Sequence, residues 1–541
     1  MDKARKPSLF RENIHVGRLF AFVAVLLLVL AWFWAGVSLG PNPAMAAAGS
    51  EELPPPEVGP GPYNLTLFHT NDSHSNFLPR PAVWRDDGRL VGGVIPLAWH
   101  LARERETTAA DIFLDAGDFM TGNPVCTMVV DGVMGGAIPE MMNGLGYTAG
   151  LIGNHEFDIG RRNLGALVKR FNFPLLAADI MNEAGEPEFR SEPVLLESGG
   201  LRVGILGVSC AGMEEVVTLS RLEGVRLVPQ AEVVRAQAAK LDPRTDLLVL
   251  LTHNGVDGDR KLARELAGSG IDVIVGGHSH TRLKEPELEA GILIVQAGSG
   301  WTNLGRLDLV VENDRIVRYR GRLITLWADG TSAGPDLTEV IGRYEAMMDR
   351  EFKRRIGTLV QDWRRGRGET NVGSWLADQI RIRAETEVAL LNSGTIRKGL
   401  NAGPITALDI HEMLPFSNTL VTMELTGDDL AAVVQRNADS QVDGNHGILQ
   451  VSGIQYEFRA AGGGKSAEVM EILVGGEPVA PGSTYTVAMP DYVAMMGNVY
   501  LGIEPPQVHE VGVNMTQAII EAVEASGPIS AGIEGRIRRL D

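Results

Sequence analysis

Cysteine is nearly absent from this sequence of 541 residues, which contains only Cys126 and Cys210. Their spacing leaves open whether the two thiols are free or paired. Neither cysteine follows the long apolar stretch near the N-terminus. A lipid anchor on a cysteine next to a signal segment is therefore excluded.

Positive charge is also scarce. The formal net charge is −19, and it becomes −22 without residues 1–48, which carry five basic and two acidic side chains. A surface of this sign repels phosphate backbones, so we expect no nucleic-acid polymer as a partner. An anionic substrate must instead be attracted by local positive charge, from metal ions and a few arginines.

Residues 1–48 have the layout of a secretory signal. Basic side chains come first, an apolar run covers residues 19–39, and the small residues that follow offer cleavage sites at Ala46 or Ala48. The apolar run is also long enough to span a bilayer as an uncleaved anchor, and only then do we expect contact with a membrane. Both alternatives place the protein outside the cytoplasmic membrane, in the periplasm or the extracellular medium. Residues 49–62, rich in Pro, Gly and Glu, predict a linker.

The chain is long enough for two or more domains. In its first half, five short apolar runs predict buried strands of the kind that helices usually cover on both faces: residues 65–68, 112–114, 151–152, 247–251 and 273–275. Polar side chains follow each run, in this order: Asp72 and His74; Asp118; Asn154 and His155; His253; His278 and His280. Functional groups gather at the carboxyl ends of such strands, so we expect one convergent polar site.

Each of these groups alone has an ordinary explanation, because a single His after a strand is usually structural and Gly-Asp is a common turn. Five such groups in this order favour a two-metal site. The donors are oxygen and nitrogen with no thiolate, which suits Mn, Zn, Mg or Fe.

At this point the chain resembles the calcineurin-like metallophosphoesterases, with their D-x-H, GD, GNHE, H and GH-x-H blocks. The strings "LFHTNDSHSNF", "IGNHEFDIG" and "IVGGHSHT" resemble more closely the bacterial 5′-nucleotidase, UDP-sugar hydrolase and 2′,3′-cyclic phosphodiesterase family. The resemblance implies a four-layer α/β/β/α sandwich followed by a smaller C-terminal α/β substrate-binding domain. It implies hydrolysis of phosphate esters by a water molecule that two metal ions activate.

The resemblance also implies a role for each polar residue. One metal ion would be held by Asp72, His74, Asp118 and His280. The other would be held by Asp118, Asn154, His253 and His278, with Asp118 as the bridge. His155 would stabilise the transition state and help the leaving group depart, with Asp158 orienting its ring.

The second half is expected to bind a nucleotide or nucleotide sugar. We place the first domain at residues 63–335, a solvent-exposed connecting helix at 336–357 and the second domain at 358–541, whose strings "LLNSGTIRKGL" and "LPFSNTL" resemble the family's C-terminal domain. The resemblance implies that Arg367 and Arg397 pair with phosphate or substrate oxygens, with Asn392 and Gly394 lining the same pocket. Phe416 and Tyr492 match two aromatic residues between which the base stacks.

One string departs from the family pattern. Where the family has Gly-Gly-Asp-Gly-Tyr, this chain has Met496, Gly497, Asn498, Val499 and Tyr500. Asn498 keeps a hydrogen-bonding side chain but loses the charge that would accept bonds from sugar hydroxyls, and Met496 and Val499 add bulk. The metal ligands are complete while the nucleoside pocket is altered.

Two other functions fit parts of the pattern. The related thiosulfohydrolases use similar metals on a sulfur-carrier protein, but the ordinary GNHEFD block and the aromatic pair disfavour that activity. A non-catalytic nucleotide-binding protein or adhesin on the same scaffold is disfavoured because no expected ligand is missing.

Overall fold

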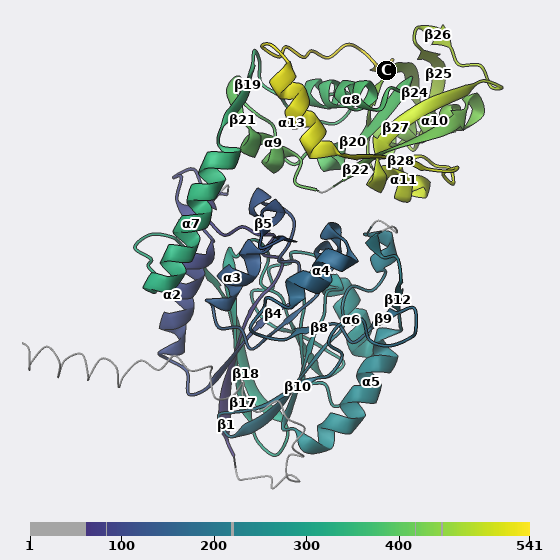
Figure 1. Ribbon diagram of the computed structural model, residues 1–541. Coiled ribbons are helices and arrows are strands. Elements are labelled where there is room, and N and C mark those ends of the chain that lie inside the picture. The colour runs from purple at the N-terminus through teal and green to yellow at the C-terminus, as the bar shows by residue number, and fades with distance from the viewer. Residues whose placement is uncertain (1–60, 83, 218–220, 417, 445–446) are drawn as a thin grey trace, which may run out of the picture. The chain divides into compact units, whose positions relative to one another are not determined.

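The computed structural model describes residues 61–82, 84–217, 221–416, 418–444 and 447–541. The predicted signal segment, residues 1–48, and nearly all of the predicted linker, residues 49–62, lie outside these residues. Within them, no helix combines the length and the hydrophobicity that crossing a membrane requires. The described chain forms two α/β domains, and many of their helices and strands are labelled in Figure 1.

The first domain is built on two six-stranded mixed sheets. The first sheet has the order β18 (Ile316–Thr325), β17 (Asn303–Val311), β1 (Tyr63–Thr70), β4 (Asp111–Asp115), β7 (Ala149–Leu151) and β8 (Leu175–Leu176). The second has the order β10 (Val194–Ser198), β11 (Leu201–Gly207), β13 (Leu247–Leu251), β14 (Val273–Val275), β16 (Ile292–Val295) and β15 (Glu287–Glu289). The strands from β1 to β8 are parallel, as are those from β11 to β16, so each sheet collects several carboxyl ends at one edge.

Alternation along the strands explains how the layers pack. In β1, Leu65 and Leu67 lie in the cluster between the two sheets, whereas Phe68 points into the cluster under the helices. The outer face of the first sheet is covered by α2 (Val94–Arg105), α3 (Ala137–Asn143) and α4 (Arg161–Val168), and that of the second by α5 (Gln230–Leu241) and α6 (Gly255–Glu265). The predicted α/β/β/α sandwich is confirmed. The broader expectation that helices cover both faces of the strands is wrong, because each sheet has the other sheet on one face.

The predicted connecting helix corresponds to α7 (Pro335–Phe352). It begins with a proline in its first turn, where the missing N–H costs no hydrogen bond. One face of it is buried at helical spacing by Leu337, Ile341, Tyr344, Met348 and Phe352, and these side chains belong to the core cluster of the first domain. The expected solvent-exposed connection therefore has one buried face. The predicted domain boundaries stay predictions.

The second domain has a five-stranded and a four-stranded sheet. The five-stranded sheet has the order β23 (Leu449–Ser452), β20 (Val388–Asn392), β27 (Thr484–Pro490), β22 (Thr419–Thr426) and β28 (His509–Asn514). The four-stranded sheet has the order β26 (Glu477–Pro478), β25 (Ser466–Val474), β24 (Ile454–Ala461) and β29 (Ile537–Arg539). One core cluster joins the larger sheet to α8 (Asn371–Ala384), α9 (Ala407–Met413) and α13 (Met515–Ala525). Another joins it to α10 (Gly427–Asp443) and to β24.

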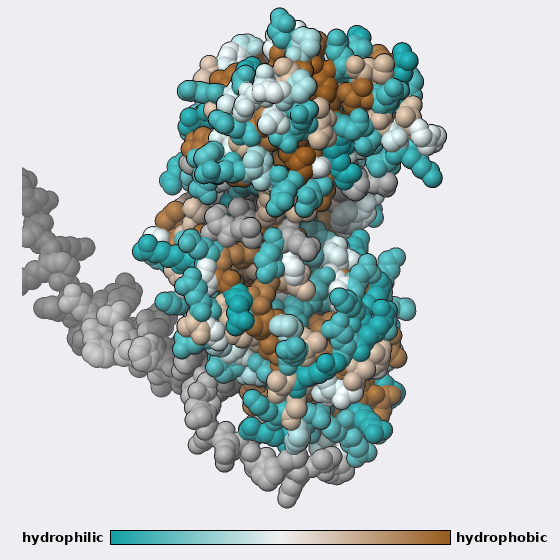
Figure 2. Space-filling view, turned by 90° about the vertical axis from the view of Figure 1, so that its right-hand side faces the viewer, coloured by the Kyte–Doolittle hydropathy of each residue, from teal (hydrophilic) through white to brown (hydrophobic). Residues whose placement is uncertain are grey.

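Four strand pairs lie outside these sheets: β2 (Arg80–Pro81) with β3 (Leu90–Val91), β5 (Val129–Val130) with β6 (Val133–Met134), β9 (Ile180–Asn182) with β12 (Val225–Leu227), and β19 (Arg355–Leu359) with β21 (Gly403–Thr406). Hydrophilic and hydrophobic residues are interspersed on the face drawn in Figure 2. Cys126 and Cys210 are buried and free, which answers the question that their spacing left open.

Candidate active site

The five predicted strands are confirmed as β1, β4, β7, β13 and β14. β1, β4 and β7 are parallel neighbours in the first sheet, and β13 and β14 are parallel neighbours in the second. Each strand ends two to five residues before its polar side chains. The carboxyl ends of both sheets therefore bring these side chains together, as the sequence predicted.

The backbone at these strand ends is unusual. Five of the seven predicted metal ligands have a positive φ between 47° and 77°: Asp72, His74, Asp118, His278 and His280. Residues other than glycine rarely adopt this left-handed conformation, and strained backbone of this kind concentrates at functional sites.

Two glycines allow the strand ends to approach one another. A Cβ at Gly153 would lie 2.3 Å from Oδ1 of Asp118. A Cβ at Gly277 would lie 2.6 Å from Nδ1 of His253 and 2.7 Å from the carbonyl oxygen of Ala116. A side chain at Gly153 would collide with Asp118, and one at Gly277 would collide with His253 and the backbone of Ala116. Close packing therefore requires glycine at both positions.

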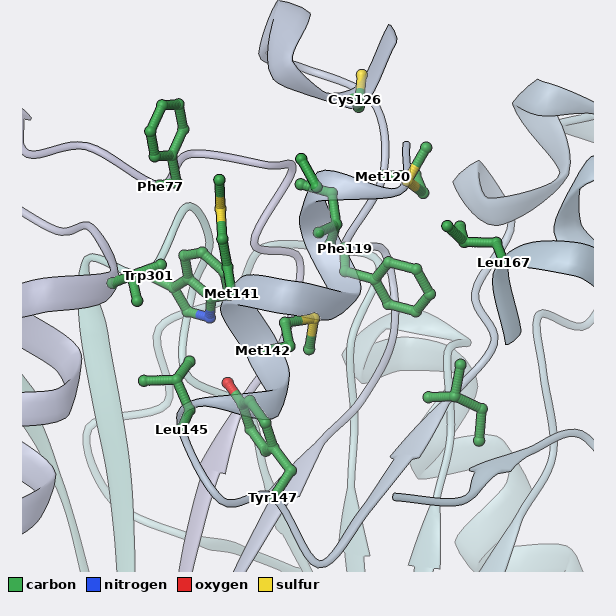
Figure 3. Close-up of a cluster of buried hydrophobic side chains, with 14 of the residues drawn as sticks. Phe77, Phe119, Met120, Cys126, Met141, Met142, Leu145, Tyr147, Leu167 and Trp301 are labelled. Atoms are coloured by element: carbon green, nitrogen blue, oxygen red, sulfur yellow. The ribbon is translucent and has the colours of Figure 1, made fainter. Parts of the chain in front are cut away.

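Apolar side chains fix the loop that carries Asp118. Phe119 and Met120 follow it directly and are fully buried with Met141 and Met142 of α3 (Figure 3). Burying a Phe or Met side chain contributes about 1.5–3 kcal/mol. The loop is therefore held by the hydrophobic core beneath it.

The polar side chains form two clusters, and the first contains Asp72, His74 and His280. Nε2 of His74 and Nε2 of His280 are 2.9 Å apart, and Oδ1 of Asp72 lies 3.3 Å from the latter nitrogen and 3.9 Å from the former. Asn71 donates a hydrogen bond of 2.5 Å to Oδ2 of Asp72. Three potential ligand atoms thus face a common point.

The second cluster contains Asp118, His253 and His278. Nε2 of His253 lies 3.0 Å from Oδ2 of Asp118, and Nδ1 of His278 lies 2.9 Å from Oδ1 of Asn154. The clusters adjoin, because Nε2 of His253 is also 3.7 Å from Oδ1 of Asp72.

The donor atoms suit divalent cations. Nδ1 of His253 lies 2.6 Å from the carbonyl oxygen of Ala116, and Nδ1 of His74 lies 3.0 Å from that of Thr121. A carbonyl oxygen only accepts, so these Nδ1 atoms carry the hydrogens and, in the neutral rings, the Nε2 atoms present lone pairs to the clusters. Nε2 of His253 is fully buried, and its nearest acceptor is Oδ2 of Asp118 at 3.0 Å, to which the described residues show no well-aligned hydrogen bond. A lone pair held beside a carboxylate in this way fits an intervening metal ion.

The charges of the two clusters also suit a bound cation. Burial lowers the pKa of His253, but the carboxylates of Asp118 and Asp72 reverse this effect and raise it to about 10. Burial lowers the pKa of His74 to about 4, and here too Asp118 acts in the opposite direction. Asp118 therefore acts on a histidine of each cluster, as expected of a group between them. Buried negative charge of this kind attracts a cation.

His155 and Asp158 form a pair beside the clusters. Both lie in the 3₁₀ helix η2 (His155–Ile159), and Nδ1 of His155 is 2.7 Å from Oδ2 of Asp158. The backbone N–H of His155 also donates to Oδ1 of Asp118. Burial lowers the pKa of His155, but Asp158 and Asp118 outweigh it and raise the pKa to about 9. The predicted pairing of a histidine with an orienting carboxylate is present in the structure.

A cavity of about 280 Å³ adjoins this pair. Asn154, His155, Asp158 and His278 line it together with predicted substrate-binding residues: Asn392, Gly394, Arg397, Phe416 and Tyr492. The guanidinium carbon of Arg397 lies 5.6 Å from the ring centroid of Phe416, whose ring is 6.4 Å from that of His155. An aromatic ring, an arginine and the His155–Asp158 pair thus share one space.

Two predicted substrate residues do not line this cavity. Arg367 is exposed and lines a separate hollow of about 490 Å³, to which Gly394 also contributes. Asn498 is exposed on the short helix α12 (Gly497–Tyr500). Met496 and Val499 do not line the cavity either.

Three residues of the site carried no role in the sequence analysis. Tyr500 lines the cavity with its ring centroid 6.0 Å from that of Tyr492. Glu156 accepts three backbone hydrogen bonds beside Asp118, and its place in the GNHE block was the available signal. Arg221 lines the cavity and donates to Asp158, and no motif marked it.

Two family models match the chain. One, described as calcineurin-like phosphoesterase, matches residues 65–282, and the other, described as 5′-nucleotidase, C-terminal domain, matches residues 345–502. The first match includes both clusters and the His155–Asp158 pair. The second includes every predicted substrate-binding residue.

Several known proteins are similar over most of the chain. The trifunctional nucleotide phosphoesterase protein YfkN of Bacillus subtilis is 27% identical over 89% of this chain, which spans 35% of that protein. An apyrase of Tabanus yao is 27% identical over 90% of this chain and 96% of its own. The crystal structure of a 5′-nucleotidase precursor from Thermus thermophilus has a TM-score of 0.71 at 27% identity, and covers 88% of this chain and 100% of its own.

Proposed function

The chain belongs to the 5′-nucleotidase family of metal-dependent phosphoric ester hydrolases, and on that premise we propose that it releases phosphate from nucleotides. The observation that carries this proposal is the shared cavity. It joins Asn154, His155 and His278 of the first domain to Arg397 and Phe416 of the second. A phosphate ester bound at the clusters would therefore place its organic group against an aromatic ring.

We assign the metal ligands as the sequence implied. Asp72, His74, Asp118 and His280 would hold one ion, and Asp118, Asn154, His253 and His278 the other. Two divalent ions at such a site supply Lewis acidity, lower the pKa of a bound water and offset the charge of the phosphoryl group. The electrostatic effect of Asp118 on a histidine of each cluster supports its place as the bridge.

His155 would act on the leaving group. The leaving oxygen of a nucleotide is an alkoxide, which departs readily only when it receives a proton. The raised pKa of His155 keeps its ring protonated near neutral pH, and Asp158 holds Nδ1 so that Nε2 can face the substrate. The pair thus supplies a proton at a fixed position.

The second domain would bind the rest of the substrate. Arg397 would pair with substrate oxygens, with Asn392 and Gly394 beside it, and the base would stack on Phe416 and Tyr492. The contacts of Arg367 and Asn498 with substrate stay predictions, because neither residue lines the cavity. We place the activity outside the cytoplasmic membrane, because residues 1–48 have the layout of a secretory signal.

The test is phosphate release from AMP, UMP, UDP-glucose and 2′,3′-cyclic AMP with added Mn²⁺. We expect at least one nucleotide to be hydrolysed, and the activity to disappear after exhaustive chelation and to return with metal. Asp118→Ala, purified in parallel, controls for a contaminating phosphatase. Activity that survives chelation after elemental analysis confirms metal loss would contradict the two-metal site. A metal-loaded protein that is inactive on the whole panel would refute nucleotide hydrolysis and leave the thiosulfohydrolase and binding-protein alternatives.

A further inference from the structure

Arg221 reaches the candidate active site from a part of the chain that carries no motif. It lies between η3 (Met213–Glu215) and β12, outside the strand ends that supply the metal clusters. Its side chain is 16% exposed and lines the same cavity as His155 and Asp158. An arginine buried to this degree beside reacting groups requires an explanation, because such residues are seldom buried without a specific partner.

One of its partners is Asp158, the carboxylate that orients His155. One oxygen of Asp158, Oδ2, accepts hydrogen bonds from Nδ1 of His155 and from Oγ1 of Thr121, each 2.7 Å long. The other oxygen, Oδ1, accepts a hydrogen bond of 3.4 Å from Nη1 of Arg221. Both oxygens are thus engaged from different directions, so the carboxylate cannot rotate without losing a contact. Burial alone would raise the pKa of Asp158, but His155 and Arg221 hold it below its usual value.

We propose that Arg221 is a positioning residue that fixes Asp158, and through it the ring of His155, for proton donation to the leaving oxygen. The inference rests on the proposed function. The oxygen of the attacking water bonds to phosphorus as the bond between phosphorus and the leaving oxygen breaks. The electron pair of the broken bond stays on the leaving oxygen, and a proton passes to that oxygen from His155. A ring that rotates freely would hold this proton in the required direction for less of the time.

The alternative role for Arg221 is direct binding of substrate phosphate. The carboxylates around its guanidinium disfavour that role, because Asp158 lies at 3.4 Å and Asp491 at 3.9 Å. A phosphate group would have to compete with both. The two roles predict different kinetics, since a positioning residue affects the rate of the chemical step and a binding residue affects the affinity for substrate.

The experiment compares two leaving groups. AMP releases an alkoxide that needs a proton, whereas p-nitrophenyl phosphate releases a phenolate that is stable without one. For Arg221→Ala we expect kcat on AMP to fall roughly 10–100-fold, by analogy with the loss when a group that orients a metal-bound histidine is removed, with KM within about twofold of wild type. The loss on p-nitrophenyl phosphate should be much smaller. Arg221→Lys, which keeps the charge but not the planar fork, should recover part of the rate on AMP.

Arg202 provides a matched control. Its side chain is 15% exposed and pairs with Asp246, but Arg202 lies at the amino end of β11 and Asp246 directly before β13, away from the clusters. Arg202→Ala should leave both substrates unaffected. A further test is the double variant with Asp158→Ala, in which removing Arg221 should cause no additional loss if it acts only through Asp158.

The outcomes separate the possibilities. Equal losses on both substrates, a raised KM for AMP with unchanged kcat, or a full additional loss in the Asp158→Ala background would each overturn the inference. If Arg221→Ala does not fold, Arg221→Lys and its double variant carry the same comparison. A wild-type enzyme that releases no phosphate from any nucleotide would refute the proposed function itself, whereas a normal wild type with any of these variant patterns would refute only the role of Arg221.

Discussion

Glu156 connects two of the strand ends that build the site, and its replacement by Gln is the most direct test of how the site is held. Its carboxylate is fully buried. Oε2 accepts the backbone N–H groups of Gly153 at 2.7 Å and Asp118 at 3.0 Å, and Oε1 accepts that of Met120 at 3.0 Å. One side chain therefore joins the loop after β4 to the loop after β7.

Gln has nearly the same shape but only one accepting oxygen. If the NH₂ group replaces Oε1, the hydrogen bond from Met120 is lost. If it replaces Oε2, those from Gly153 and Asp118 are lost. A buried donor without an acceptor costs about 1–3 kcal/mol, so we expect Glu156→Gln to weaken the connection by about 2–4 kcal/mol. Burial and Asp118 raise the pKa of Glu156 to about 8, although the hydrogen bonds from Met120 and Gly153 favour the ionised form. The two proteins are therefore compared above pH 8, where the ionised carboxylate accepts all three hydrogen bonds.

Hydrogen exchange of the backbone amides measures this directly, because the three donors are themselves exchangeable. A loss of about 2 kcal/mol should make the amides of residues 118, 120 and 153 exchange roughly 30-fold faster if they exchange by local opening. Metal affinity should fall about 10–100-fold, since these loops carry Asp118 and Asn154. Glu287→Gln is the control, because Glu287 lies on β15, the edge strand of the second sheet, and accepts two hydrogen bonds from Arg260 of α6. Unchanged exchange in Glu156→Gln would show that the carboxyl group is already protonated and that our account of this connection is wrong.

Four further substitutions test other parts of the molecule. His155→Ala should lower kcat by on the order of 10²–10⁴ with metal content unchanged, whereas Asp118→Ala should lose metal as well; loss of metal in both would make His155 a ligand. Phe416→Ala should weaken nucleotide hydrolysis by roughly 1–3 kcal/mol if base stacking is lost but spare p-nitrophenyl phosphate, and equal losses on both would assign Phe416 to packing alone. Burial raises the pKa of Asp272 from 3.8 to about 7, so the folded state binds more protons between these values and stability falls as pH rises through them. The melting temperature should therefore fall between pH 5 and pH 8, and Asp272→Asn should make this fall smaller. An unchanged dependence of the melting temperature on pH would contradict the raised pKa of Asp272.

The strand ends could be predicted because their signal is local. A short apolar run followed at once by Asp72, Asp118 or His253 identifies both a buried strand and the side chains at its carboxyl end. What covers a strand is not local. A fully buried run has the same composition whether a helix or a second sheet packs on it, which is why the general expectation of helices on both faces was wrong for these sheets. For the same reason, the spacing in α7 predicted a helix but not that its apolar face is buried in the first domain.

Contacts between distant segments explain the residues that were missed. Arg221 lies 63 positions from Asp158 in the sequence, and the residues around it show no periodicity that points to the cavity. Glu156 is adjacent to His155, but its partners become visible only when β4 and β7 lie side by side. A charged residue buried by such contacts looks like a surface residue in the sequence.

The altered string in the second domain can now be interpreted from its geometry. Gly497 is retained where a Cβ would lie 2.3 Å from Cγ of Pro505, and Tyr500 still reaches the cavity and the ring of Tyr492. Asn498, by contrast, is exposed and outside the lining. Asn498, at the position where the family has a carboxylate for sugar hydroxyls, therefore does not line the cavity. The aromatic residues Phe416, Tyr492 and Tyr500 all line it. We therefore expect this enzyme to depend more on the base and the phosphate than on the sugar, so that loss of a ribose hydroxyl from the substrate should change kcat/KM less than loss of the base.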